Sequence, residues 1–377
     1  MLKSTFGAVL ALIGAAATAN VPASRSDLTV HEWGTFTSVA GEDGRAVAWR
    51  PLAGAADLPC FVERASLPPK FSFRTTVRME TPVIYFYAAN PLTVDVTVRF
   101  RQGWLTEFFP HAASRADRLD WTDVQVRPGQ RVDFIEEAAP NHYYAARAAR
   151  AAPLQVGGQD EGFLFYRGVG GFELPVRATE KAAGQIEIIN AGLDPISAVM
   201  LFENRGGRIG FRIHATITDR LVLPAVDLDG DASQVRSELT QMLIAEGLYP
   251  SEAEAMVATW QDSWFEEGTR LFYVVPRPLV DRTLPLDIRP EPAHLTRVFA
   301  GRLEIATAAT LSQLEDALMR GDATALEKHG RFLEPFSQRL LARDMMEETR
   351  AQMRGALARM ADPKPGQPCE SSSLSDR

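Results

Sequence analysis

The segment Thr81–Phe100, TPVIYFYAANPLTVDVTVRF, constrains the fold of this chain most strongly. Its second part, Thr93–Phe100, alternates polar and apolar residues at every position. Successive side chains of a strand point to opposite faces, so this alternation predicts a strand with one buried face and one face toward solvent. Asn90 and Pro91, which separate the two parts, are typical of a turn. A strand–turn–strand unit of this kind predicts an antiparallel sheet.

The same kind of pattern continues from Asp27 to Pro224. Short runs rich in Val, Ile, Phe, Tyr and Thr stand between breaks of Gly, Pro and Asn. Several short strands separated by turns favour a sandwich or a barrel over a parallel α/β sheet. The other strands that this pattern predicts are Thr29–Val39, Thr81–Tyr87, Phe163–Tyr166, Ile186–Ile189, Ala198–Phe202 and Ile209–Thr218.

Helical periodicity replaces the strand pattern after about residue 225. Ser233–Glu246 has a helical pattern that ends at Gly247. Ser251 and Glu254 match the capping box S-x-x-E and predict the start of a second helix, which is joined to the first by the short link GLYP. Such a link predicts an antiparallel helical hairpin. The segments predicted from here on are a helix at Glu252–Glu267, a strand at Arg270–Pro276, a helix at Thr310–Met319 and one long helix at Pro335–Met360.

Together these segments predict an α+β fold. It consists of a mostly antiparallel, sandwich-like β body, a helical hairpin and a C-terminal helical extension. The predicted organisation is a signal peptide at 1–19, a β-rich body at 27–225, a region with the hairpin, a return strand and the C-terminal helices at 226–361, and a flexible tail at 362–377. The tail is predicted to be flexible because it lacks apolar residues.

The N-terminus has the three parts of a secretory signal peptide. Lys3 precedes the apolar run Phe6–Ala19, which closes on the small residues Ala17 to Ala19. A transmembrane helix needs about 20 apolar residues, and no stretch of the chain reaches that length. We therefore expect export to the periplasm or the cell exterior, with no transmembrane segment after cleavage. The alternative is an uncleaved N-terminal anchor.

Charge, cysteines and motifs exclude several classes of function. The net charge is −8 and no Lys/Arg run occurs, so nucleic acid is not an expected partner. The sequence has no H-E-x-x-H helix, no G-x-S-x-G elbow and no phosphate loop, which excludes common zinc proteases, serine hydrolases and nucleotide enzymes. Cys60 and Cys369 either pair in an oxidising compartment or stay as two thiols, and the sequence does not choose between these states.

The segment VHEWGTFTSV places a histidine, a glutamate and a tryptophan next to one another. In a regular strand His31 and Trp33 share one face, whereas Glu32 points to the other. An imidazole beside an indole suits the wall of a sugar-binding site, because an aromatic face stacks on the apolar face of a sugar. The alternative is a core tryptophan beside a hydrogen-bonded histidine.

A second group of candidates precedes or follows the apolar strands. Glu80 stands at the start of the most apolar strand, where it is either a structural ion pair with Arg78 or a carboxylate with a raised pKa, usable in acid–base catalysis. The segment NHYYAAR contributes His142, Tyr143 and Arg147, and Arg167 ends a further strand. Loop residues of this kind are frequently functional, although tyrosines that lie on a sheet surface would give the same pattern.

The acidic segment DLDGDASQVRSE matches part of a calcium-binding loop. Asp227, Asp229, Asp231 and Glu238 occupy positions 1, 3, 5 and 12 of an EF-hand-type loop, and a predicted helix follows. Position 6 is Ala232, where the sharp turn requires glycine. The alternative is an acidic helix start, in which the carboxylates offset the helix dipole and Ser233 caps the helix.

Five segments resemble an uncharacterised family of exported bacterial proteins that carry an N-terminal HEWGTF-type segment. The resemblance covers most of the chain after residue 19. It implies export and a common fold but no particular activity, so no site residue is carried over from it. The segments are VHEWGTFTSVAGEDG, RMETPVIYFY, NHYYAAR, FLFYRGVGGF and EGLYPSEAEAMVATWQDSWFEEGTRLFYVVPR.

Two functional hypotheses follow from these residues. The first is an exported carbohydrate-active hydrolase or lyase, which requires the catalytic candidates and His31 to converge around one concave pocket. The second is a non-catalytic cell-envelope or ligand-binding protein, whose ligand is a carbohydrate or another small molecule. In the first hypothesis the acid–base residues are Glu80, His142 and Tyr143, Arg147 and Arg167 bind a charged group, and His31 and Trp33 form a stacking wall.

Overall fold

The computed structural model describes residues 26–52, 57–65 and 74–360. The predicted signal peptide, the predicted tail and Cys369 lie outside these residues. Export, the flexibility of the tail and the pairing of Cys60 with Cys369 therefore stay predictions.

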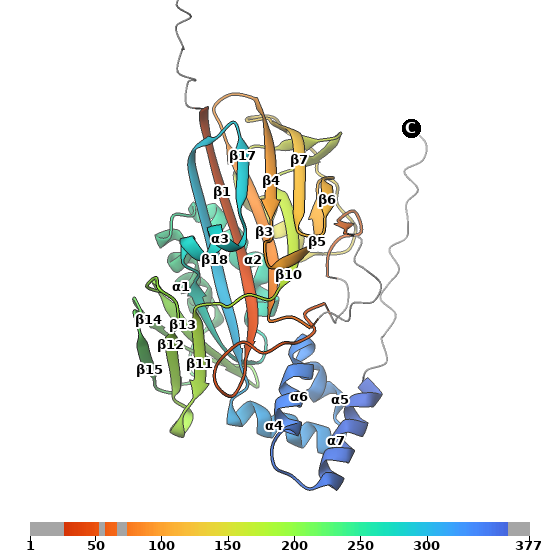
Figure 1. The fold of residues 1–377 in the computed structure, drawn as a ribbon, viewed down its shortest axis with the longest axis vertical. Helices are drawn as coiled ribbons and strands as arrows, with labels where there is room; N and C mark the ends of the chain where they lie inside the picture. Colours follow the sequence, from red (N-terminus) through yellow and green to blue (C-terminus); the bar gives the residue numbers. More distant parts are fainter. Residues whose placement is uncertain (1–25, 53–56, 66–73, 361–377) are drawn as a thin grey trace, which may run out of the picture.

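The described residues form a nine-stranded sheet at the centre of the molecule (Figure 1). Its order is β14-β13-β16-β18-β1-β3-β10-β5-β2. The two longest strands, β1 and β18, lie side by side and are parallel, with Trp33 opposite Val298. The other neighbours in this sheet are antiparallel. The strands are β1 (Ser26–Ala40), β2 (Glu63–Arg64), β3 (Val77–Tyr87), β5 (Gly103–Phe109), β10 (Leu164–Gly170), β13 (Val199–Arg205), β14 (Arg208–His214), β16 (Gly268–Val274) and β18 (Pro292–Ile305).

Two smaller sheets cover one face of the central sheet. One has the order β17-β4-β7-β8-β9, with β6 on β7, and the other has the order β11-β12-β15. In β4 the predicted alternation is confirmed, since Val94, Val96 and Val98 are buried while Asp95 and Arg99 are exposed. The strands are β4 (Leu92–Arg99), β6 (Ala113–Arg115), β7 (Arg118–Val126), β8 (Leu154–Val156), β9 (Gln159–Glu161), β11 (Val176–Glu180), β12 (Ile186–Asn190), β15 (Arg220–Leu223) and β17 (Leu286–Arg289).

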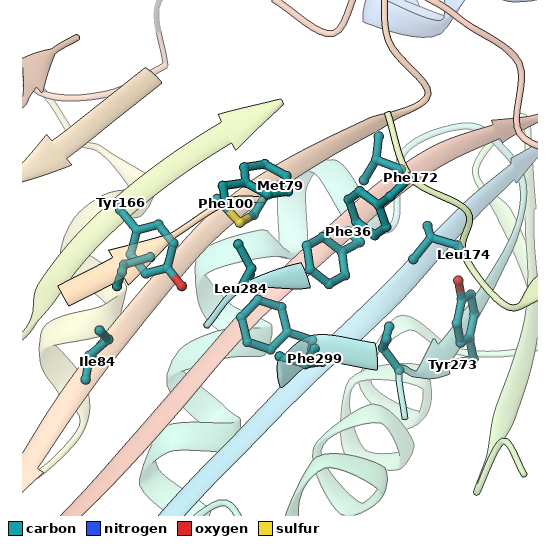
Figure 2. Packing of buried hydrophobic residues seen from close by; sticks show 14 of the residues in the cluster. Phe36, Met79, Ile84, Phe100, Tyr166, Phe172, Leu174, Tyr273, Leu284 and Phe299 are labelled. Carbon is teal, nitrogen blue, oxygen red and sulfur yellow. The ribbon is translucent and has the colours of Figure 1, made fainter. Parts of the chain in front are cut away.

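Apolar side chains from all three sheets form one core between these layers. At its centre the ring of Phe36 stacks on Phe299 at a centroid distance of 5.0 Å, and Phe172 meets Phe36 edge-on at 5.2 Å (Figure 2). Burying such aromatic side chains is the main favourable term in folding. The sandwich predicted from the strand pattern is therefore held together by rings from distant parts of the chain.

The helical hairpin covers the opposite face of the central sheet. The helices α1 (Ala232–Ala245) and α2 (Pro250–Trp264) pack there with the 3-10 helix η1 (His142–Ala148). The predicted capping box is wrong by two residues. Glu252 is the N3 residue of α2, and its carboxylate accepts a hydrogen bond from the backbone N–H of Tyr249 at 2.7 Å. Because Pro250 is suited to the first position of a helix, α2 starts before Ser251.

The C-terminal extension contains a third apolar cluster at one end of the molecule (Figure 1). The predicted single helix at Pro335–Met360 is wrong, because residues 342–346 break it into two. The break lets both halves pack on α4, so that Leu340 and Met353 are buried in the same cluster. The remaining helices are α3 (Arg277–Thr283), α4 (Ala308–Arg320), α5 (Ala323–Glu327), α6 (Leu333–Leu341), α7 (Glu347–Met360) and the 3-10 helices η2 (Ala182–Gly184) and η3 (Gly330–Phe332).

The predicted fold class is confirmed as α+β, with a sandwich-like β body, a helical hairpin and a C-terminal helical extension. The predicted boundary at residue 225 does not separate the sheets, because β16 and β18 lie in the same sheet as β1 and β17 pairs with β4. The parallel pairing of β1 with β18 joins segments that sequence pattern alone does not connect. Every helix in the described ranges is too short or too polar to cross a bilayer.

Gly301 tests the packing of the central sheet. A Cβ at this position would lie 2.1 Å from Cζ of the buried Tyr273 ring on β16. We predict that Gly301→Ala lowers the free energy of unfolding by roughly 1–3 kcal/mol, the usual cost of overpacking. The control is Gly171→Ala, where the nearest atom to an added Cβ lies at 3.9 Å. Equal urea midpoints for the two variants would contradict this packing.

Candidate functional site

His31 and Glu32 point to opposite faces of β1, as the strand alternation predicts. His31 faces the hairpin, where its Nδ1 lies 2.8 Å from a carboxylate oxygen of Glu252 and its ring lies 4.4 Å from that of Tyr249. Glu32 faces the sandwich core, where Arg297 and the hydroxyl of Tyr166 donate to it. The two residues therefore belong to separate polar clusters and do not form a dyad.

The predicted sugar-stacking wall is buried. His31 and Trp33 share the hairpin face as predicted, but their side chains are only 3% and 0% exposed. Trp33 packs in the apolar cluster of the hairpin beside Tyr85, at a ring distance of 6.3 Å. This arrangement favours the alternative that the sequence left open, a core tryptophan beside a hydrogen-bonded histidine.

A bulge in β3 decides where Glu80 points. Thr35 pairs with Glu80 but Trp33 pairs with Val83, so β3 holds one extra residue at this place. Thr81 adopts a φ of 45° there, directly before Pro82. Such a φ is a strained conformation for a β-branched residue. The bulge puts Glu80 and Val83 on the same face of the sheet, the face that carries the hairpin.

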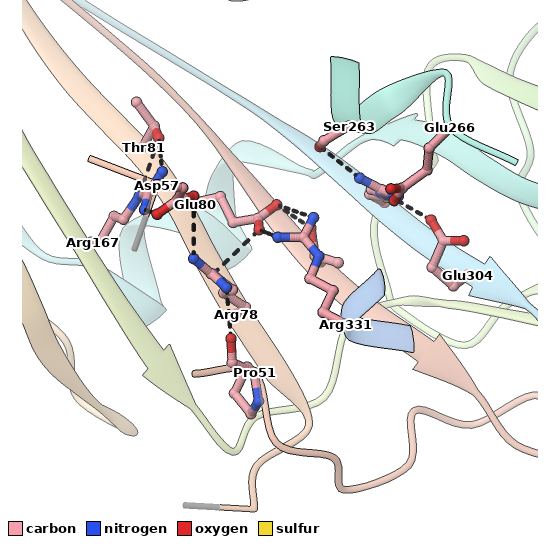
Figure 3. A network of polar contacts seen from close by, with 12 residues as sticks. Pro51, Asp57, Arg78, Glu80, Thr81, Arg167, Ser263, Glu266, Glu304 and Arg331 are labelled. Atoms are coloured by element: carbon pink, nitrogen blue, oxygen red, sulfur yellow. Dashed lines mark hydrogen bonds and ion pairs between the residues drawn. The ribbon is translucent and has the colours of Figure 1, made fainter. Parts of the chain in front are cut away.

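Glu80 is fully buried in an ion-pair cluster (Figure 3). Thr37 on β1 donates a hydrogen bond to it at 2.7 Å, Arg331 of η3 binds it, and Arg78 Nε lies 3.3 Å from its carboxylate. Burial alone would raise the pKa of Glu80, but Arg331, Arg78 and Arg302 outweigh burial and lower this pKa to about 2. The raised pKa considered for an acid–base role is therefore contradicted, and the alternative, an ion pair with Arg78, is present.

The charged groups continue across the sheet from β3 to β18. Arg302 donates to Glu304 at 2.6 Å, to Glu266 at 2.7 Å and to Ser263 at 3.0 Å (Figure 3). Ser263 lies in the last turn of α2, and Glu266 follows this helix. We call Arg78, Glu80, Arg302, Glu304 and Arg331 the ionic layer. It lies on the hairpin face, and through Arg331 it connects the central sheet to the C-terminal extension.

Arg167 contacts His142, another predicted site residue, close to the ionic layer. Its Nη2 lies 3.2 Å from Nε2 of His142, and its Nη1 donates to Asp57 at 2.7 Å. Its Nε and Nη2 also lie 3.4 Å from the Thr81 hydroxyl on the β3 bulge. The guanidinium only donates, so His142 Nε2 accepts and the ring proton is on Nδ1.

His142 is uncharged at neutral pH in this setting. Burial, and then the positive charge of Arg167, lower the pKa of His142 to about 4. The imidazole ring lies 5.4 Å from that of Trp260, near the end of α2. His31 contacts Glu252 at the start of the same helix, roughly 12 Å away at about 1.5 Å per residue. The structure thus groups Glu80, His142 and Arg167 but leaves His31 outside.

Asp57 is the partner that the sequence did not predict. Burial would raise the pKa of Asp57, but Arg167 and Arg78 outweigh burial and hold this pKa below its usual range. Its side chain is 40% exposed, so it is the most accessible member of the group. No local pattern in the sequence marks Asp57, because its role depends on two arginines from distant strands.

Tyr143 and Arg147 bind the carboxylate of Glu161 on β9, not that of Glu80 or Asp57. The Tyr143 hydroxyl donates to Glu161 at 3.0 Å, and Arg147 donates to both oxygens of this carboxylate, at 3.0 and 2.8 Å. Glu161 is fully buried, so its charge needs both partners. Tyr143 and Arg147 therefore hold η1 against the sheet and lie apart from the contacts of His142.

The acidic loop is engaged at both of its ends. Asp227 pairs with Arg212 at 3.0 Å, and the Asp231 side chain caps α1 by accepting from the backbone N–H of Ser233 at 3.3 Å. Asp229 lies between them in the loop and Glu238 lies in α1. Within the described ranges no group of three or more His, Cys, Asp or Glu side chains is arranged to hold a metal ion.

A polar cleft of about 560 Å³ lies on the outer face of β17, β4 and β7, away from the predicted residues. Its floor carries the polar residues of β4 that the alternation predicts to face solvent. Across the strands Thr97 lies opposite Asp287 on one side and Asp120 on the other. Asp120 accepts two hydrogen bonds from Arg118 and one from Thr97, all at 2.6 Å.

Two arginines of this cleft have no ion pair with any described residue. Arg99 lies directly opposite Arg118, and Arg101 follows in the turn after β4. Arg118 is neutralised by Asp120, whereas neither Arg99 nor Arg101 has an ion pair among the described residues.

Replacing Glu80 tests the ionic layer. We predict that Glu80→Gln lowers the free energy of unfolding by about 3–5 kcal/mol at pH 7, because it leaves buried guanidiniums uncompensated. The pKa of Glu80 is lowered to about 2, so the stability it contributes is present above about pH 4.5 and is lost as pH falls toward 2. Urea unfolding should therefore depend less on pH between 5 and 2 in the variant. The control is Glu254→Gln, at an exposed position of α2.

No protein-family model and no curated protein sequence matches the chain. Among solved structures, the yeast delta-COP-I mu-homology domain is similar with a TM-score of 0.32 and 8% identity, over 74% of this chain and 98% of that chain. The same domain in complex with the Dsl1 WxWxV peptide is similar with a TM-score of 0.30 and 8% identity, over 74% of this chain and 96% of that one. We draw no conclusion on fold or function from similarity at this level.

Proposed function

We propose that the chain is an exported, non-catalytic protein that binds an acidic carbohydrate in the polar cleft of β17, β4 and β7. The observation that carries this proposal is the pair Arg99 and Arg101, which have no ion pair in the described part of the chain and lie beside a floor of threonine and carboxylate groups. Arginine is suited to carboxylates, and neighbouring polar groups are suited to sugar hydroxyls. The volume of about 560 Å³ lies in the range of small-molecule sites.

Support for export comes from the sequence. The signal-peptide pattern at residues 1–19 and the resemblance to exported proteins with an HEWGTF-type segment both favour it. The state of two acid–base candidates favours binding over catalysis, since Glu80 is engaged in a buried ion pair and Tyr143 in a buried hydrogen bond.

The cleft arginines give a direct test of binding. The probes are polygalacturonate, a uronic acid polymer, and dextran, a neutral one, in titration calorimetry. We expect the parent to bind polygalacturonate and not dextran. The double variant Arg99→Gln/Arg101→Gln should weaken this binding at least tenfold, because a hydrogen bond to a charged group is worth about 1.5–3 kcal/mol. Both residues are exposed, so the fold should be unaffected.

The control for this test is Arg131→Gln, an exposed arginine outside the cleft. It should leave the affinity for polygalacturonate unchanged. Equal affinity of the double variant and the parent, or equal affinity for dextran and polygalacturonate, would refute the proposal.

A second candidate function is a hydrolase or lyase that acts on the same class of ligand. It is favoured by one observation, the grouping of the His142 imidazole with Arg167 and the partly exposed carboxylate of Asp57. In that case the parent would release reducing ends or unsaturated uronate from polygalacturonate, and His142→Gln would abolish this release. Retained binding without any product supports the non-catalytic protein.

Calcium binding by the acidic loop is also a proposal. Its support is the spacing of Asp227, Asp229, Asp231 and Glu238. If calcium binds there, the melting temperature should rise in millimolar Ca²⁺ and fall in EDTA, because a ligand that binds only the folded state stabilises it. Asp229→Asn should reduce the shift. Identical melting in Ca²⁺ and EDTA would remove the calcium site from consideration.

A further inference from the structure

The strand β18 has an open edge over part of its length. Its other edge pairs with β1 throughout, from Pro292 to Ile305. On the open side β16 pairs with it only up to the contact of Val275 with Phe299, after which the chain turns into α3. No strand of the described residues pairs with this side of β18 beside residues 295–298.

The backbone groups that face this open side can be identified from their neighbours. The carbonyl of Phe299 accepts from Val275 N–H at 2.8 Å, and that of Leu295 accepts from Arg277 Nη1 at 3.1 Å. Alternate residues of a strand direct both backbone groups to the same edge, so Arg297 N–H and C=O point to the open side between these two carbonyls. Neither group has a hydrogen-bond partner in the part of the chain that the structure describes.

A groove of about 400 Å³ surrounds this edge. Pro195, Pro276 and Pro278 line it, and proline has no backbone N–H with which to pair with the strand. The α1–α2 turn bounds one side through Glu246, and α3 bounds the other through Arg277. An exposed edge with unpaired backbone groups is a template for an added strand.

The charges of the groove indicate which kind of added strand can bind beside β18. Its arginines are engaged, Arg277 with Asp281 and Arg297 with Glu32 and Asp281. Its two remaining carboxylates, Asp194 and Glu246, have no ion pair among the described residues. A second copy of β18 would bring two such pairs of carboxylates together, so like charges disfavour a symmetric edge-to-edge dimer.

We propose that the open edge of β18 receives an extended peptide segment of a partner protein, and that this segment carries a basic side chain. Arg297 N–H and C=O would pair with one residue of the peptide. The lysine or arginine of the peptide would lie near Asp194 and Glu246.

The test uses a pool of fluorescein-labelled octapeptides with alternating Val and Thr, in which one Lys is placed at each position in turn. We expect at least one member to bind the full chain below about 1 mM, seen by fluorescence anisotropy. A backbone N-methyl group at the central residue of that peptide should weaken binding at least tenfold, and replacement of its Lys by Glu should do the same. Absence of binding across the pool, or equal binding of the N-methylated peptide, would overturn the proposal.

Variants of the groove locate the binding. Ser197→Trp fills the groove from an exposed position and should abolish binding, whereas Ser114→Trp on β6 should not. Glu246→Gln should weaken binding several-fold, with Asp316→Asn on α4 as its control. The Arg297 amide should exchange quickly in the free protein and slowly with peptide. Protection of this amide in a dimer without peptide would overturn the proposal in favour of a second copy.

Discussion

The parallel pairing of β1 with β18 is the contact on which the other layers depend. It places the first described strand beside the last one, so the central sheet closes only when both halves of the chain are present. Residues that alternate along β1 supply both apolar clusters, with Phe36 in the sandwich core and Trp33 under the hairpin. A pairing between segments so far apart in sequence carries a large entropic cost of loop closure, which the two apolar faces must offset.

Local pattern predicts the elements of this fold better than their partners. The alternation in β4, the helices α1 and α2 and the return strand β16 were all identifiable, because each buries a periodic set of side chains. The parallel β1–β18 pair was missed, since no local signal reports which strand lies beside another. The break between α6 and α7 was missed because helical propensity continues through residues 342–346, while packing on α4 requires the chain to turn back.

Three residues of the predicted site, Glu80, His142 and Arg167, lie in one charged neighbourhood, and the others do not. The reason is the register of β3 against β1. Simple alternation along β3 puts Glu80 on the face of Ile84, but the bulge at Thr81 transfers it to the face of Val83. The sequence also cannot reveal a counter-ion such as Asp57 or Arg331, which comes from a distant loop. Residue type alone therefore leaves a raised pKa and an ion pair as equal alternatives for Glu80, whereas in the structure three arginines lower its pKa.

The ionic layer affects the order in which parts of the molecule unfold. It lies between two apolar clusters that have no member in common, one under the hairpin and one in the C-terminal extension. Charged contacts weaken in acid, where their carboxylates become protonated, whereas apolar contacts do not depend on charge. The extension is thus attached to the central sheet both through these charged contacts and through Val39 of β1, which packs in its apolar cluster. Because only the charged part of this attachment depends on pH, we expect acid to open the extension before the sandwich and the hairpin unfold.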